Sequence, residues 1–180
     1  MLLQRLTILT TLLLALCVSV SGLQADELKV GDQAPDFELP GSDGKTYRLS
    51  DFKGKQTVVI AWFPKAFTGG CTKECKSFRD QGEAIRKFDV AYFTASVDPP
   101  KKNKDFAMSL ELDYPILSDP GKSTAKAYGV VNETRQFPYR WTYYIGPDGK
   151  ILHIDREVNA ANHGKDLVDQ LEKLGVKKKG

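Results

Sequence analysis

Residues 57–62, Thr-Val-Val-Ile-Ala-Trp, constrain the fold of this chain more than any other segment. An apolar run without polar–apolar alternation is typical of a strand that is buried on both faces of a sheet. A glycine-containing loop follows, and Cys71 stands where residues 71–88 take up helical spacing. The first turn of a helix carries unpaired N–H groups and the positive end of the helix dipole, which stabilise a thiolate. The segment therefore predicts a strand, a loop and a helix that presents one reactive cysteine.

The rest of the chain continues the alternation of strands and helices. Residues 90–97 predict a second buried strand, and hence a strand–helix–strand crossover. Residues 141–145 and 151–155 flank Gly146-Pro147-Asp148-Gly149, which predicts a hairpin. Helices are expected at 101–110 and 122–128 and at the C-terminus, where one face carries Leu167, Val168, Leu171 and Leu174. This order predicts an α/β fold with a central mixed sheet flanked by helices.

Residues 1–25 have the pattern of a signal peptide. Arg5 is the one charged residue, residues 6–20 are mainly apolar, and small residues precede the acidic pair at 26–27. Cleavage is expected between 21 and 25, which leaves a domain at 26–180 and predicts export to the periplasm or the extracellular space. The alternative is an uncleaved membrane anchor, for which the apolar core is short.

Charge and cysteine content narrow the function classes. The chain of 180 residues has a net charge of +3, and loss of Arg5 would lower it by one. No basic stripe with interleaved aromatic residues indicates nucleic-acid binding. Of three cysteines, Cys17 lies in the signal peptide, and only Cys71 and Cys75 follow it. Two cysteines so close together cannot join distant parts of a fold, so they indicate chemistry rather than a disulfide framework.

Pro64, Thr68 and Cys71 form Pro-x-x-x-Thr-x-x-Cys, and the chain thereby resembles the peroxiredoxins (AhpC/TSA superfamily). Glu74 and the Phe-Arg-Asp at 78–80 are similar to the bacterioferritin-comigratory-protein, or Q-type, branch. Further motifs of this family are similar to residues 31–37 (its opening strand), 117–120, 127–130 and Arg140-x-Thr142-x-x-Ile145-x-x-Asp148-Gly149. The resemblance covers roughly residues 30–175 and implies a thioredoxin fold.

The same resemblance implies a thiol peroxidase that reduces hydrogen peroxide and organic hydroperoxides through a sulfenic acid on Cys71. Thr68 would place a hydroxyl beside the sulfur, Pro64 would shield the loop from water, and Arg140 would donate to both thiolate and peroxide. Glu74 would orient Arg140, or would simply complement the helix dipole. The implied partners are a peroxide and a thioredoxin-like or low-molecular-weight thiol reductant. A monomer without a metal or cofactor is expected.

Cys75 has two open interpretations, a resolving cysteine and a bystander thiol. In the Q-type branch a resolving cysteine in this helix usually follows the first by five residues, whereas here the separation is four. Side chains four apart on a helix have Cβ atoms about 5–6 Å apart, and a disulfide needs about 3.5–4.5 Å. The first turn must therefore unwind before a bond to Cys71 can close, and Gly69, where the family usually has proline, would ease that movement.

Three other functions compete with peroxide reduction. The spacing Cys71-x-x-x-Cys75 also resembles that of SCO-type copper-binding assembly proteins. In such a protein two thiolates and an imidazole would bind copper, which these ligands suit. Their distal histidine would precede the late strand, where this chain has Pro-Tyr-Arg at 138–140. His153 and His163 come after that position, and each is expected to be a lone histidine without a functional partner. A thiol–disulfide oxidoreductase would need Cys-x-x-Cys, which is absent, and a non-catalytic redox sensor is a further alternative.

Overall fold

The computed structural model describes residues 27–180, so the predicted signal peptide at 1–25 lies outside the described residues. Five strands form one mixed sheet in the order β5-β4-β3-β6-β7. β3 (Thr57–Trp62), β4 (Val90–Ser96) and β5 (Ile116–Ser118) pair in parallel. β6 (Thr142–Ile145) pairs antiparallel with β3, and β7 (Ile151–Asp155) pairs antiparallel with β6. All six residues of β3 are buried, because β3 is the central strand and lies between β4 and β6. The predicted central strand is confirmed.

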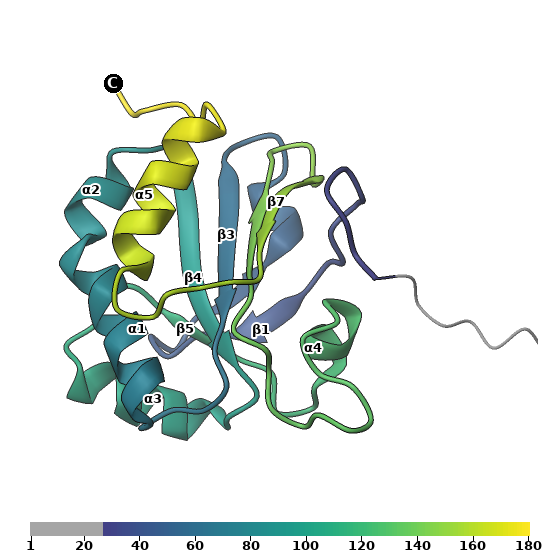
Figure 1. Ribbon diagram of the computed structural model, residues 1–180, viewed down its shortest axis with the longest axis vertical. Helices are drawn as coiled ribbons and strands as arrows, with labels where there is room; N and C mark the ends of the chain where they lie inside the picture. The colour runs from purple at the N-terminus through teal and green to yellow at the C-terminus, as the bar shows by residue number, and fades with distance from the viewer. Residues whose placement is uncertain (1–26) are drawn as a thin grey trace, which may run out of the picture.

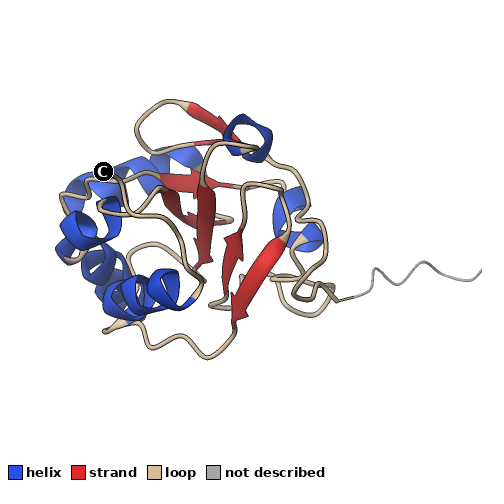
Figure 2. Ribbon diagram, turned by 90° about the horizontal axis from the view of Figure 1, so that it is seen from above, coloured by secondary structure: helices blue, strands red, loops and turns tan. Residues whose placement is uncertain are grey.

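Helices cover both faces of this sheet (Figures 1 and 2). On one face, α1 (Gly69–Asp80), α2 (Gly82–Arg86) and α5 (His163–Lys173) pack against alternate residues of β3, Val59 and Ala61. The other face, with Ile60 and Trp62, is covered by η1 (Leu49–Phe52), α4 (Ser123–Ala127) and the hairpin of β1 (Glu38–Pro40) and β2 (Thr46–Arg48). Helix α3 (Pro100–Ser109) packs on β5. The predicted α/β fold with a central mixed sheet is confirmed.

Two predicted elements differ from the structure. The helix expected over 71–88 is interrupted at Gln81, which ends α1 and precedes Gly82, the first residue of α2. Glycine is a poor helix former, and this residue permits the break. Residues 31–37 do not form the expected opening strand: a single bridge joins Gln33 to Lys150, and Pro35 has no N–H to extend a ladder.

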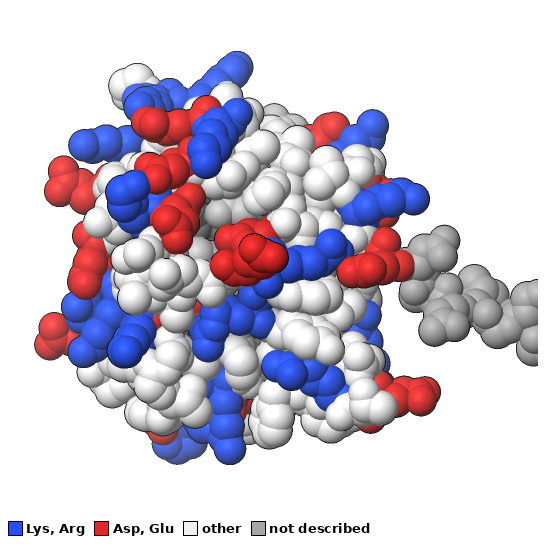
Figure 3. Space-filling view, in the orientation of Figure 1, with Lys and Arg blue, Asp and Glu red and all other residues white. Residues whose placement is uncertain are grey.

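The surface drawn in Figure 3 carries basic and acidic side chains interspersed with neutral ones, without one large patch of a single sign. This agrees with the nearly balanced charge of the sequence. Within residues 27–180, no helix is both long and apolar enough to cross a membrane.

Candidate active site

Cys71 is the third residue of α1, so the thiol lies in the first helical turn, as predicted. The loop from β3 delivers it there, at the end of the sheet where the parallel strands finish. The side chain is almost completely buried, with 1% of its surface exposed. Its Sγ accepts a hydrogen bond of 3.4 Å from Nη2 of Arg140. A guanidinium and the positive end of a helix dipole therefore both lie beside the sulfur.

Arg140 lies two residues before the start of β6, far from Cys71 in sequence, and the fold brings the two together. Its Nη1 donates to Oε2 of Glu74, which is fully buried one helical turn after Cys71. Gly70 makes room for this arrangement, because a Cβ on that residue would lie 3.2 Å from Nη2 of Arg140. One guanidinium thus contacts the buried carboxylate and the thiol with its two terminal nitrogens. The contact that the sequence predicted between Glu74 and Arg140 is thus present in the structure.

His163 belongs to the same cluster, and the expectation of a lone histidine is wrong for this residue. Its Nδ1 lies 2.9 Å from Oε1 of Glu74, and its Nε2 lies 2.9 Å from the hydroxyl of Thr142 on β6. The ring is 1% exposed. Burial, aided by the charge of Arg140, lowers the pKa of His163 to about 3, so the ring is neutral at physiological pH.

The sequence offered only weak signals for this contact. Eighty-nine positions separate His163 from Glu74, so no local spacing connects them. Thr142 stands within the Arg140 motif, but a hydroxyl on a strand has no distinctive signature. The first turn of α5 must pack against α1 before the ring can reach the carboxylate.

Polar contacts from the segment that follows β4 hold the loop that precedes Cys71. Oδ2 of the buried Asp98 accepts the backbone N–H of Ala66 at 2.8 Å, and Oδ1 pairs with Nζ of Lys102 at 2.6 Å. Phe67 has a positive φ of 65°, which is uncommon for a bulky residue, and its ring packs against Phe106 at 4.9 Å between centroids. The surroundings therefore hold this loop in one particular path.

The structure does not bring the Thr68 hydroxyl to the sulfur. Oγ1 of this exposed residue donates to the carbonyl of Lys65 at 2.9 Å, and among the described residues no hydrogen bond joins it to Cys71. The hydroxyl is satisfied by a nearby carbonyl within its own turn, as is common for threonine in loops. Pro64 is half-buried just after the end of β3, at the start of the same loop.

Cys75 is fully buried one turn further along α1. Both cysteines of the described chain are free thiols. Burial raises the pKa of the Cys75 thiol to about 12, so it stays protonated in this arrangement. It packs with Phe63, Phe106 and Ile116. A protonated thiol within an apolar cluster is a poor nucleophile, so any reaction of Cys75 requires α1 to open first.

The histidines give little support to a copper site. Across residues 27–180, no group of three or more His, Cys, Asp or Glu side chains is placed to hold a metal ion. Both ring nitrogens of His163 are engaged by Glu74 and Thr142. His153 lies on β7 with its ring 5.5 Å from that of Tyr144.

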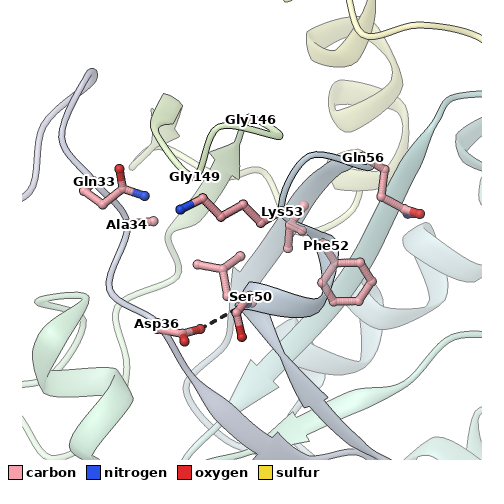
Figure 4. A pocket seen from close by; sticks show the side chains of 11 residues that line it. Gln33, Ala34, Asp36, Ser50, Phe52, Lys53, Gln56, Gly146 and Gly149 are labelled. Atoms are coloured by element: carbon pink, nitrogen blue, oxygen red, sulfur yellow. Dashed lines mark hydrogen bonds between the residues drawn. The ribbon is translucent and has the colours of Figure 1, made fainter.

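A cavity of about 300 Å³ lies at the other end of the sheet from the thiol. Gln56 and Val58, at the start of β3, line it, whereas Cys71 follows the end of that strand. Figure 4 shows the side chain of Lys53 extending across it toward Gly149. This position separates the cavity from the chemistry at Cys71.

A thioredoxin-like sheet and helices that hold one cysteine beneath a guanidinium define a thiol-based redox enzyme. Residues 30–154 match the AhpC/TSA family, and the chain belongs to this family of peroxiredoxins, which are thiol-dependent peroxidases. The earlier resemblance to its Bcp, or Q-type, branch is thus confirmed.

The similarity to individual relatives extends over nearly the whole length of each relative. The chain is 34% identical over 151 residues to Peroxiredoxin Bcp of Escherichia coli K12, covering 81% of this chain and 96% of that protein. It is 30% identical over 156 residues to Peroxiredoxin Bcp of Bacillus subtilis, covering 83% and 99%. The crystal structure of Peroxidoxin BcpB from Mycobacterium tuberculosis superimposes with a TM-score of 0.74 at 32% identity, covering 82% and 98%.

Proposed function

We propose that this peroxidase reduces hydrogen peroxide and organic hydroperoxides with Cys71 as its nucleophile. The thiolate attacks one peroxide oxygen, the O–O bond breaks, and the sulfur becomes a sulfenic acid. The leaving oxygen takes up a proton and departs as water or an alcohol. The observation that carries this proposal is the hydrogen bond of 3.4 Å between Arg140 and the Cys71 sulfur at a helix N-terminus.

Arg140 is suited to both oxygens of the peroxide as well as to the sulfur. It remains charged at any physiological pH and presents several donors in a fixed plane, so it can stabilise charge that develops as the O–O bond breaks. Thr68 is exposed beside this turn, and exchanging its Lys65 contact for the peroxide would supply a further hydrogen bond. Pro64 would limit access of water to the loop, since it has no N–H to attract a solvent molecule.

Cys75 is proposed as the resolving cysteine. Its thiolate would attack the sulfenic sulfur of Cys71, form a disulfide and release water, after which a thioredoxin-like or low-molecular-weight thiol reduces the disulfide. The burial of both sulfurs supports a slow step in which the first turns of α1 unwind. Helix ends open at a low free-energy cost, which makes such a step accessible.

Stopped-flow mixing of the reduced protein with peroxide tests both roles. Cys71→Ser is expected to abolish peroxide consumption, and Cys75→Ser is expected to keep the first oxidation fast while making Cys71 prone to over-oxidation. Peptide mapping after one equivalent of peroxide should find Cys71 bridged to Cys75. Normal turnover by Cys71→Ser would refute the proposal. Sulfenic and sulfinic acid without that bridge in the wild type would instead indicate a one-cysteine enzyme resolved by an external thiol.

The protein is further proposed to work outside the cytoplasm as a monomer. Residues 1–25 carry the charged, apolar and small-residue order of a signal peptide, which supports export to the periplasm or the extracellular space. The alternative, retention of this segment as a membrane anchor, would leave the same catalytic domain tethered at the membrane surface.

A further inference from the structure

The contacts of His163 form a chain of hydrogen bonds that ends at the reactive sulfur. The chain begins at Thr142 on β6, passes through His163 on α5 and Glu74 on α1, and reaches Arg140. Side chains of β6, α5 and α1 are thus linked in series to the guanidinium of Arg140. Thr142, His163 and Glu74 are each 0–1% exposed, so water does not compete for these bonds.

The direction of each bond follows from the chemistry of the carboxylate. Glu74 faces the guanidinium of Arg140 through Oε2, so it is ionised and can only accept hydrogen bonds. Nδ1 of His163 must therefore carry the proton that it shares with Oε1. A neutral ring then leaves Nε2 without a proton, and this nitrogen accepts the hydroxyl proton of Thr142. Each hydrogen bond of the chain then has one donor and one acceptor, without conflict.

The ring itself is held rigidly. Phe78 packs edge-to-face against it, with 4.7 Å between ring centroids and 76° between the planes. The next residue, Gly164, donates its backbone N–H to Oγ of Ser77 on α1 at 2.9 Å. A Cβ on Gly164 would lie 2.7 Å from the carbonyl carbon of Ser77, so the two helices approach at backbone distance here. His163 therefore acts as a fixed support rather than as a mobile side chain.

Arg140 needs such a support. Its long side chain is 21% exposed and has many rotamers, of which few place one terminal nitrogen on the sulfur. Glu74 restricts them, but a glutamate also has three rotatable bonds and would swing without its second contact. We infer that His163, fixed by Thr142 as the neutral Nδ1–H tautomer, is a positioning residue that holds Glu74 and thereby aims Arg140 at Cys71.

This inference rests on the proposed role of Cys71, but its first test does not depend on activity. The chain has two histidines, and long-range ¹H–¹⁵N NMR of the wild type distinguishes their tautomers. The signal that disappears in His163→Gln identifies His163. We expect a protonated Nδ1 and an unprotonated Nε2, unchanged from pH 5 to pH 9. An Nε2–H tautomer, or a ring that gains a second proton within this range, would overturn the arrangement even if the protein is an active peroxidase.

The second test measures the rate constant for oxidation of Cys71 by hydrogen peroxide. Thr142→Val removes the hydroxyl at nearly constant shape and is expected to slow this reaction about tenfold, whereas the matched Thr142→Ser keeps the hydroxyl and the rate. His163→Leu is expected to slow it by about tenfold or more, and the effect should appear in the oxidation step with the fold intact by circular dichroism. Equal rates for the valine and serine variants would refute the positioning role, and so would a wild-type rate in both Thr142→Val and His163→Leu. A wild type that does not react with peroxide would refute the proposed function instead, and the tautomer result would still stand.

Discussion

Replacing Arg140 with methionine should destabilise the protein in a manner that depends on pH. The substitution keeps much of the apolar stem and removes the charge that faces Glu74. Glu74 is fully buried, and its remaining hydrogen bond comes from His163. Removing one partner of a buried ion pair typically costs about 3–5 kcal/mol, because the other charge is left without compensation.

Protonation sets a limit to this cost. Neutralising a carboxyl with an ordinary pKa of about 4.3 at pH 7.5 costs about 4 kcal/mol. The variant should therefore lose about 3–4 kcal/mol at pH 7.5 and take up one proton at the Glu74–His163 pair when it folds. Whichever of the two residues holds the proton, the folded variant binds one more proton than the folded wild type. The loss of stability should then shrink by about 1.4 kcal/mol for each unit of decrease in pH.

Urea denaturation at pH 7.5 and pH 5.5 measures this difference, and urea is chosen because guanidinium would screen charges. Adding Glu74→Gln to Arg140→Met removes the stranded charge, so the double variant should recover most of the stability and lose the pH dependence, without recovering peroxidase activity. Arg48→Met is the control, because its pair with Glu38 is exposed and should contribute little. The same loss at both pH values, or no recovery in the double variant, would show that Glu74 is not stabilised by Arg140.

Two further predictions concern the α1–α5 contact and the N-terminus. Gly164→Ala should destabilise the protein by about 2 kcal/mol and slow oxidation of Cys71, because overpacking against the backbone of Ser77 outweighs a helix-propensity gain of up to about 1 kcal/mol. Gly121→Ala is the control, because nothing lies within 4 Å of the new Cβ. An unchanged melting curve for the Gly164 variant would contradict this packing argument. When the full-length chain is expressed in a Gram-negative host, N-terminal sequencing of the periplasmic fraction should find a start between residues 22 and 26, whereas an intact N-terminus in the membrane fraction would favour the anchor.

Local sequence patterns predicted most of the fold. The apolar run at 57–62 could only be a strand covered on both faces, and the hairpin signal at 146–149 connected β6 to β7 as expected. The interruption of the helix at Gln81 and the irregular path of residues 31–37 were harder to predict. Each depends on how a segment packs against its neighbours, and propensity alone does not report this.

The candidate site residues also differ in how far the sequence predicted them. The sequence alone determined that Cys71 lies in the first turn of a helix after a buried strand, since apolar runs, glycines and helical periodicity act over a few residues. The family motifs added Arg140 and Glu74 as candidates and implied that the guanidinium contacts both the sulfur and the carboxylate, and the structure shows both contacts.

Only the tertiary structure determined the contacts of His163 and the burial of the Cys75 thiol. The histidine meets Glu74 only because α5 packs on α1 at backbone distance. The pKa of the Cys75 thiol is raised because the thiol is buried in a cluster with Phe63, Phe106 and Ile116. Burial and the meeting of distant side chains arise from the packed chain as a whole. A pattern of neighbouring residues predicts neither the burial of a side chain nor its distant contacts, because both depend on segments far away in the sequence.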